Sequence, residues 1–275
     1  MFNKRHIVRT IAATVSILAL SFTAACGSGQ STASNSTDSD DITQQTYKPG
    51  KLTIATGQPA YEPWVMNDKP ESGEGYEAAV AYAVADKLGF KKSDVVWTRT
   101  AFDTAIAPGA KDWDFNIQQF GITDERKKAV DFSSSYYNDS QSVVVKKDSK
   151  FANATKVSDL KDATVGVMVG TLAYDYAKAN IKDDIQTFND DAALAQALDA
   201  GQIDALVTST VECVYMVQSE QVKDSKVLGR LPDSEDKSGM GIVLPKDSKL
   251  TAAVTKAVDD LNADGTIKKL QDKWL

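Results

Sequence analysis

Short apolar runs alternate with helical patterns from residue 51 onward. Between residues 51 and 118 the pattern predicts strands at 51–56, 95–97 and 115–118, with helices at 75–89 and 102–107 between them. In the first helix, apolar residues recur at helical spacing up to a stop at Gly89. Strands that alternate with helices in this way predict a parallel sheet covered by helices.

The same order returns in the second half of the chain. We expect strands at 142–146, 164–169, 185–187 and 203–207, with helices from 172 and at 191–200. A further strand at 241–245 can return the chain to the first unit, and two helices fill 248–275, separated at 262–265.

The repeated order predicts an α/β protein with two lobes. Lobe 1 comprises residues 50–142 and 240–275, and lobe 2 comprises residues 143–239. Two crossings between the lobes make a hinge, with a ligand cleft between the lobes.

The N-terminal segment differs from the rest. Lys4, Arg5 and Arg9 precede an uncharged run over residues 10–25, which closes on small residues. This pattern predicts a signal peptide over residues 1–25, because the run is short of the roughly 20 residues that a bilayer span needs. Residues 26–49 are rich in Ser, Thr, Asp, Gln and Gly, so we expect a disordered tether there.

The sequence Thr23-Ala24-Ala25-Cys26 resembles the lipobox of bacterial lipoproteins. The resemblance implies that Cys26 is lipidated and holds the protein at the outer face of a membrane, so the membrane is a partner only through this anchor. Thr23 stands where Leu is usual, which leaves open an ordinary cut after Ala25 and a secreted protein.

Composition excludes several kinds of chemistry. The single histidine, His6, lies in the signal, and the two cysteines are Cys26 and Cys213. Ser-His-Asp and Cys-His catalysis and His/Cys metal sites are therefore excluded, and we expect neither a metal nor a cofactor. Cys213 lies among apolar residues, which predicts a buried, inert thiol.

The charge of the chain argues against nucleic acid as a partner. Loss of Lys4, Arg5 and Arg9 with the signal leaves 28 basic and 38 acidic residues, a net charge of −10. Nucleic acid and anionic lipid are poor partners for such a surface.

Residues 114–126 place one arginine where a buried strand gives way to a helix. Thr123 is the candidate N-cap, and Arg126, Lys127 and Lys128 fill the first turns. A guanidinium beside free backbone N–H groups can grip a carboxylate with two parallel hydrogen bonds. The alternative is a surface arginine in a weak ion pair.

Eight short motifs occur in a fixed order. They are residues 61–64 (Tyr-Glu-Pro-Trp), 75–77 (Gly-Tyr-Glu), 102–106, 122–126 (Ile-Thr-Asp-Glu-Arg), 131–133 with 136–137, 169–171, 201–205 and 264–267 with 273–274. With these motifs, residues 50–275 resemble the bacterial extracellular solute-binding proteins of polar amino-acid ABC transporters, family 3.

The resemblance implies a two-lobed periplasmic-binding-protein-like fold of type II that closes on an amino acid. Arg126 would pair with the ligand carboxylate, aided by the backbone N–H groups of Gly121 and of the helix start at Thr171. Tyr61 and Phe102 would sandwich the ligand side chain, with Trp64 close behind. Met168 and Leu172, which replaces a frequent Thr, would also face the cleft.

Two further positions depart from the family pattern. Gly121 stands where Ser or Thr is common, so Gln118 or Gln119 becomes the candidate donor to the carboxylate. Ser209 stands where an Asp usually neutralises the ligand ammonium group. Either another acid compensates, or the amine is absent, modified or hydrated; the candidate acids are Glu62, Glu77 and Glu212.

The predicted function is extracytoplasmic capture of a polar amino acid or a close analogue, and its delivery to an ABC transporter permease by a monomeric binding protein that is not an enzyme. A sensory or adhesive lipoprotein is one alternative. A dehydratase-like enzyme of the same fold is another, with Glu62 or Glu77 as acid or base.

Overall fold

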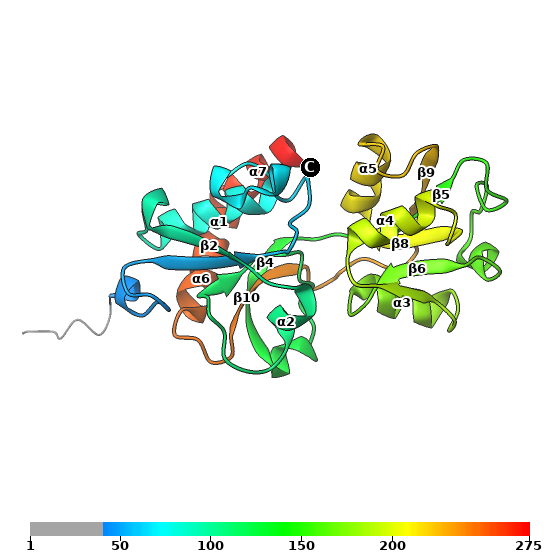
Figure 1. The fold of residues 1–275 in the computed structure, drawn as a ribbon. Coiled ribbons are helices and arrows are strands. Elements are labelled where there is room, and N and C mark those ends of the chain that lie inside the picture. The colour runs from blue at the N-terminus through cyan, green and yellow to red at the C-terminus, as the bar shows by residue number, and fades with distance from the viewer. Residues whose placement is uncertain (1–40) are drawn as a thin grey trace, which may run out of the picture. The chain divides into compact units, whose positions relative to one another are not determined.

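The computed structural model describes residues 41–275. The predicted signal peptide, Cys26 and the first part of the tether lie outside the described residues. Two mixed sheets with helices on their faces make up the fold (Figure 1), which confirms the predicted α/β class. In the described residues, no helix has the length and apolar character that crossing a membrane requires.

The first sheet has the order β2-β1-β3-β10-β4. β1 runs parallel to β2 and β3, whereas β10 runs antiparallel to β3 and β4. The strands are β1 (Leu52–Thr56), β2 (Val95–Arg99), β3 (Phe115–Asn116), β4 (Val130–Tyr137) and β10 (Met240–Pro245). The helices of this lobe are α1 (Tyr76–Lys87), α2 (Phe102–Ile106), α6 (Thr251–Ala263) and α7 (Thr266–Trp274).

The second sheet has the order β7-β6-β8-β5-β9. β6 runs parallel to β7 and β8, and β5 runs antiparallel to β8 and β9. The strands are β5 (Gln141–Lys146), β6 (Val165–Met168), β7 (Gln186–Phe188), β8 (Ala205–Ser209) and β9 (Ser225–Arg230). The helices are α3 (Leu172–Asn180), α4 (Asp191–Asp199) and α5 (Thr210–Gln218).

The chain crosses between the sheets twice. β4 belongs to the first sheet and β5 to the second, so residues 138–140 make the first crossing. Residues 231–239 make the second, between β9 and β10. Short 3-10 helices occupy Ile42–Gln44, Met66–Asp68, Pro70–Ser72, Lys92–Asp94, Arg126–Lys128 and Val157–Leu160.

The first sheet is buried on both faces. Leu52 and Ile54 of β1 pack in the same cluster as α1 and α6, whereas Ala55 packs in the cluster that contains Phe120 and Val243. Strands covered on both sides carry continuous apolar runs, which explains why β1 and β10 are easily found in the sequence.

The tether is shorter than predicted. We expected disorder up to residue 49, but Asp41 caps a 3-10 helix at Ile42–Gln44, and Thr46 is buried. The Tyr47 N–H donates to Asp114 Oδ1 at 2.5 Å, which fixes this segment to the first lobe. Composition was a poor guide here because a few anchoring contacts, and not a hydrophobic run, order the segment.

Candidate functional site

A cleft between the two lobes contains eight of the nine residues predicted to bind ligand. These lining residues are Tyr61, Phe102, Gln119, Gly121, Arg126, Met168, Thr171 and Ser209. Leu172 and Gln118 line the cleft as well. Its empty volume, open mouth included, is about 770 Å³.

The fold brings these residues together at the carboxyl ends of parallel strands. In the second lobe, β6, β7 and β8 lead into α3, α4 and α5, and each of the three helices contributes a residue of its first turn to the cleft. In the first lobe, β1 ends at Thr56 and β3 leads to Gln118, both of them cleft residues. Sites in α/β proteins commonly lie at this edge of the sheet.

Arg126 joins the two lobes. Its Nη1 donates to the Gly121 carbonyl at 2.7 Å and its Nη2 donates to the Gly170 carbonyl, in the second lobe, at 2.8 Å. The guanidinium carbon lies 5.5 Å from the centre of the Phe102 ring. Burial lowers the pKa of Arg126, and the nearby Asp175 and Asp236 carboxylates oppose that shift.

The helix predicted at Arg126 is wrong. Arg126–Lys128 form a single 3-10 turn, and β4 begins at Val130. The N-cap of this turn is Glu125 and not Thr123, although Thr123 Oγ1 accepts the Arg126 N–H at 3.1 Å. The guanidinium is therefore held by carbonyl groups and the Phe102 ring, and not by a helix N-terminus.

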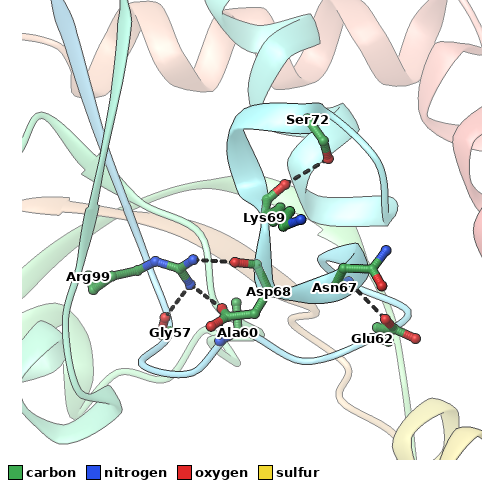
Figure 2. Close-up of polar contacts among 8 residues, drawn as sticks. All are labelled: Gly57, Ala60, Glu62, Asn67, Asp68, Lys69, Ser72 and Arg99. Atoms are coloured by element: carbon green, nitrogen blue, oxygen red, sulfur yellow. Dashed lines mark hydrogen bonds and ion pairs between the residues drawn. The ribbon is translucent and has the colours of Figure 1, made fainter.

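A network around Arg99 holds the loop that carries Tyr61 (Figure 2). Arg99 Nη1 donates to the Gly57 carbonyl at 2.9 Å and to Asp68 Oδ1 at 2.5 Å, and Nη2 donates to the Asp68 carbonyl at 2.6 Å. Asp68 Oδ1 also accepts the Ala60 N–H at 2.9 Å. Arg99 thus fixes both sides of the loop from Gly57 to Asp68.

Trp64 does not line the cleft. It is fully buried in the first lobe, where its ring centre lies 5.9 Å from that of Tyr76 and 5.6 Å from that of Tyr137. Its indole reaches toward Glu212 and lowers the pKa of that carboxyl group, so it lies behind the cleft wall. The prediction that Trp64 belongs to the ligand-binding set is therefore corrected to a core role.

Glu77 positions Gln119. The fully buried Glu77 carboxylate accepts the Gln119 N–H at 2.8 Å, and it also accepts the Gln119 side-chain amide and the Tyr136 hydroxyl. Gln119 has a left-handed backbone with a φ of 52°. Burial raises the pKa of Glu77 to about 7.

The structure separates the three acids proposed to replace the missing Asp at position 209. The Glu77 carboxyl group accepts hydrogen bonds from Gln119 and Tyr136. The Glu62 carboxyl group accepts hydrogen bonds from the Asn67 N–H (Figure 2) and the Tyr215 hydroxyl. Of the three, Glu212 alone lines the cleft. Ser209 caps α5 by accepting the Glu212 N–H at 3.2 Å.

The sequence analysis missed three other acids that line the cleft: Asp139, Asp191 and Asp236. Burial raises the pKa of each of them. One available signal was the pair Asp190–Asp191, which directly follows β7 and starts a helix at the carboxyl edge of a parallel sheet.

Further contacts join the lobes at the side of the cleft. The Tyr61 hydroxyl accepts the Ala192 N–H at 3.3 Å, and the Tyr215 hydroxyl donates to Glu62. Phe102 packs on Phe120 with ring centres 4.6 Å apart. Because both tyrosines reach across to the other lobe, the cleft walls are coupled through hydrogen bonds.

Two features of the described residues bear on other chemistry. Cys213 is fully buried, as predicted, and burial raises its pKa well above the usual range. Between residues 41 and 275, no group of three or more His, Cys, Asp or Glu side chains has an arrangement that could hold a metal ion.

Comparison with known proteins identifies the relatives of the chain. The L-cystine-binding protein TcyJ of Escherichia coli is 30% identical over 217 residues, covering 78% of this chain and 79% of its own. The L-arginine-binding protein of Pseudomonas aeruginosa is 29% identical over 243 residues, covering 82% of this chain and 88% of its own.

A solved structure has the same fold. An ancestral arginine-binding protein bound to arginine superposes with a TM-score of 0.70 at 31% identity, covering 82% of this chain and 98% of its own. A family model matches residues 52–275, and so the chain belongs to the bacterial extracellular solute-binding proteins, family 3.

Proposed function

We propose that the protein captures an amino acid with a free carboxylate and a free ammonium group outside the cytoplasm, and delivers it to the permease of an ABC importer. One observation carries the proposal. The cleft is lined by the base Arg126 from the first lobe and by the acids Asp191 and Glu212 from the second lobe, so each charged end of a zwitterion has a candidate partner. Each charged end of a buried zwitterion needs a fixed partner.

In this proposal Arg126 binds the ligand carboxylate. Its guanidinium is confined by the Phe102 ring and by two carbonyl groups, one from each lobe. The N–H groups of Gly121 and of the α3 start at Thr171 assist it, because helix N-termini favour anions. Tyr61 and Phe102 then cover the ligand side chain.

The charge of the cleft favours a basic ligand. Among the described lining residues there are four acids and one base, Arg126. The cleft continues past Tyr61, Phe102 and Met168 into a groove that Asp103 and Asp190 also line. A long cationic side chain would fit this groove, so we place a basic amino acid first and cystine second, in keeping with the ligands named for the relatives.

Lobe closure would produce the signal that the permease recognises. The crossings at 138–140 and 231–239 act as the hinge between lobe 1, which holds the first sheet, and lobe 2, which holds the second sheet and begins at β5, two residues before the predicted boundary at 143. Ligand that touches both lobes favours the closed form through its differential affinity. The monomer binds, and makes or breaks no bond.

The N-terminal segment would hold the protein at the outer face of the membrane. Removal of residues 1–25 and lipidation of Cys26 would anchor it at the outer face of the membrane. Labelling of the wild type by a radioactive fatty acid, and loss of the label in Cys26→Ser, tests the anchor. Release of unlabelled protein into the medium would instead support a cut after Ala25.

The test of binding is thermal unfolding of the protein against the proteinogenic amino acids and cystine. A ligand at 100 times its dissociation constant stabilises the fold by about 2.7 kcal/mol. A raised midpoint with one or a few amino acids supports the proposal. No shift with any of them contradicts it.

Two further assays separate the alternatives. Loss of uptake of the same amino acid on deletion of the protein marks transport, whereas a lost response with uptake intact marks a sensor. Product formed from prephenate-like acids would mark a dehydratase.

A further inference from the structure

Two buried carboxyl groups share one hydroxyl in the second-lobe wall of the cleft. Thr208 Oγ1 donates to Glu212 Oε2 at 2.7 Å and lies 3.5 Å from Asp191 Oδ1. Asp191 and Glu212 are 7% and 8% exposed, and each stands in the first turn of its helix. A hydroxyl has one proton to donate, so it serves Glu212 and leaves Asp191 with the weaker contact.

The pair has no cation beside it. Among the ion pairs of residues 41–275, none includes Asp191, Glu212 or Asp139. Arg126, the one base among the described lining residues, is bonded to the carbonyl groups of Gly121 and Gly170.

The groups that face the pair from other elements are mostly acidic or neutral. Asp190 is the N-cap of α4, Asp139 faces the pair from the first crossing, and the Glu77 carboxyl, the Tyr61 hydroxyl and the Trp64 indole face it from the first lobe. Cys213 lies beside it on α5, and Arg230 of β9 lowers the pKa of Asp139. Two carboxylates in such a site cannot both ionise without a cation.

The raised pKa values agree with this geometry. Burial raises the pKa of Asp191 well above its usual range and raises that of Glu212, and the mutual repulsion of the two groups adds to the shift of Asp191. Both shifts favour retention of a proton by the pair in the cleft without ligand.

We propose that Asp191 and Glu212, linked by Thr208, bind the ammonium group of the ligand and release a proton when they do so. Before binding, the pair carries one proton and one negative charge. After binding, both groups are ionised around the ammonium group, and the proton has passed to the buffer. The inference rests on the proposed function, which supplies the ammonium group.

A second feature of the cleft also points to a donor-rich ligand. Gln118 is 9% exposed, lines the same cleft, and its Oε1 meets no hydrogen-bond donor. The Thr56 hydroxyl, also a lining group, has no partner either. A buried acceptor without a donor costs free energy, which a ligand with several N–H groups can recover.

The pair also accounts for Ser209. This residue uses its hydroxyl to cap α5, and the acid stands three positions later, at Glu212, still in the first turn. The negative charge is therefore retained in the cleft, three residues along the chain from the position where the family resemblance places it.

The experiment is calorimetric titration with the amino acid that gives the largest thermal shift, in two buffers of different ionisation enthalpy. At about pH 6 the wild type should release about one proton per ligand bound, and its affinity should rise about tenfold per pH unit toward about pH 8. Glu212→Gln should lose this slope, and at about pH 8 should bind ~30-fold more weakly or worse.

Two further variants keep the test decisive. Asp191→Asn, as a single variant, should also lose the rise of affinity with pH. Glu220→Gln, which makes the same change at an exposed position after α5, should keep both the affinity and the slope.

The outcomes distinguish failure of the proton release from failure of the proposed amino-acid binding. Heats of binding that do not depend on the buffer, or an unchanged slope in Glu212→Gln, overturn the proton release while the binding function stands. If the wild type binds no amino acid at all, the proposed function fails, and this inference fails with it.

Discussion

A Cβ atom added to Gly121 would lie 2.5 Å from Cδ1 of Leu172, across the cleft between the lobes. Both residues depart from the family pattern, in which a hydroxyl side chain is common at each position. In this structure the Leu172 side chain fills the space that a side chain at residue 121 would need.

We therefore expect Gly121→Ser to weaken ligand binding. The added side chain crowds Leu172 and Asp236 Oδ2, 2.9 Å away, and overpacking costs about 1–3 kcal/mol, so affinity should fall about tenfold. Leu172→Thr in the same chain should restore most of it. A double-mutant cycle by calorimetry measures this coupling. Simple addition of the two effects would show that the residues are independent.

Arg126→Lys should weaken ligand binding by about 30-fold or more. An ammonium group cannot reproduce two parallel bonds to a carboxylate, and the loss of a buried charge contact costs roughly 2 kcal/mol or more. Lys128→Gln is the matched control, because Lys128 is an exposed cation two residues away that pairs with Glu125. Equal binding by Arg126→Lys and the wild type would remove Arg126 from the carboxylate site.

Glu77 should make the fold less stable as the pH rises. Its pKa of about 7 in the folded protein lies above the usual glutamate value of 4.5, so between these values the folded state holds more protons than the unfolded state. The free energy of unfolding should therefore decline by roughly 3 kcal/mol from this group as the pH rises through that window.

Glu77→Gln tests this assignment, since glutamine does not titrate. Urea unfolding across about pH 4 to 8 should show a shallower decline in the variant than in the wild type. A decline of the same size in both proteins would assign the pH dependence to other groups, such as Asp191 and Glu212.

Arg99→Lys should weaken ligand binding through Tyr61. The Arg99 guanidinium bonds the Gly57 carbonyl, the Asp68 carbonyl and Asp68 Oδ1 through two nitrogen atoms. The single nitrogen of lysine lacks this planar geometry, so the loop that carries Tyr61 loosens. We expect a loss of about 3-fold to 10-fold in affinity, from roughly 1 kcal/mol of lost hydrogen bonding. Lys51→Gln breaks an ion pair with Asp94 at the starts of β1 and β2, and should leave affinity unchanged. If both variants bind equally well, Arg99 does not position Tyr61.

Much of the fold could be predicted because its strands are buried on both faces. β1, β6, β8 and β10 are apolar runs, and the glycines near α1 mark its ends. β4 was missed because Val130–Tyr137 is rich in serine, with most of its residues half-buried, and it pairs with β10 from far along the chain. Such pairing is tertiary and leaves little local pattern.

The site could be predicted less completely. Arg126 and the lining aromatics Tyr61 and Phe102 stand in recognisable motifs, but Trp64 shares the first motif and still belongs to the core. The acid pair had no motif, because Asp191 and Glu212 come from separate helices that the second sheet brings together. α5 was not predicted either, so the position of Glu212 on a helix was not known.

The central claim is that the cleft binds both charged ends of an amino acid. Calorimetric titration of the protein with the best amino acid, its deaminated analogue and its decarboxylated analogue tests this most directly. We predict that removal of either end weakens binding by about 30-fold or more, since each removal leaves a buried charge without its partner. If the deaminated acid binds as tightly as the amino acid, the acids of the cleft do not bind an ammonium group and the account is contradicted.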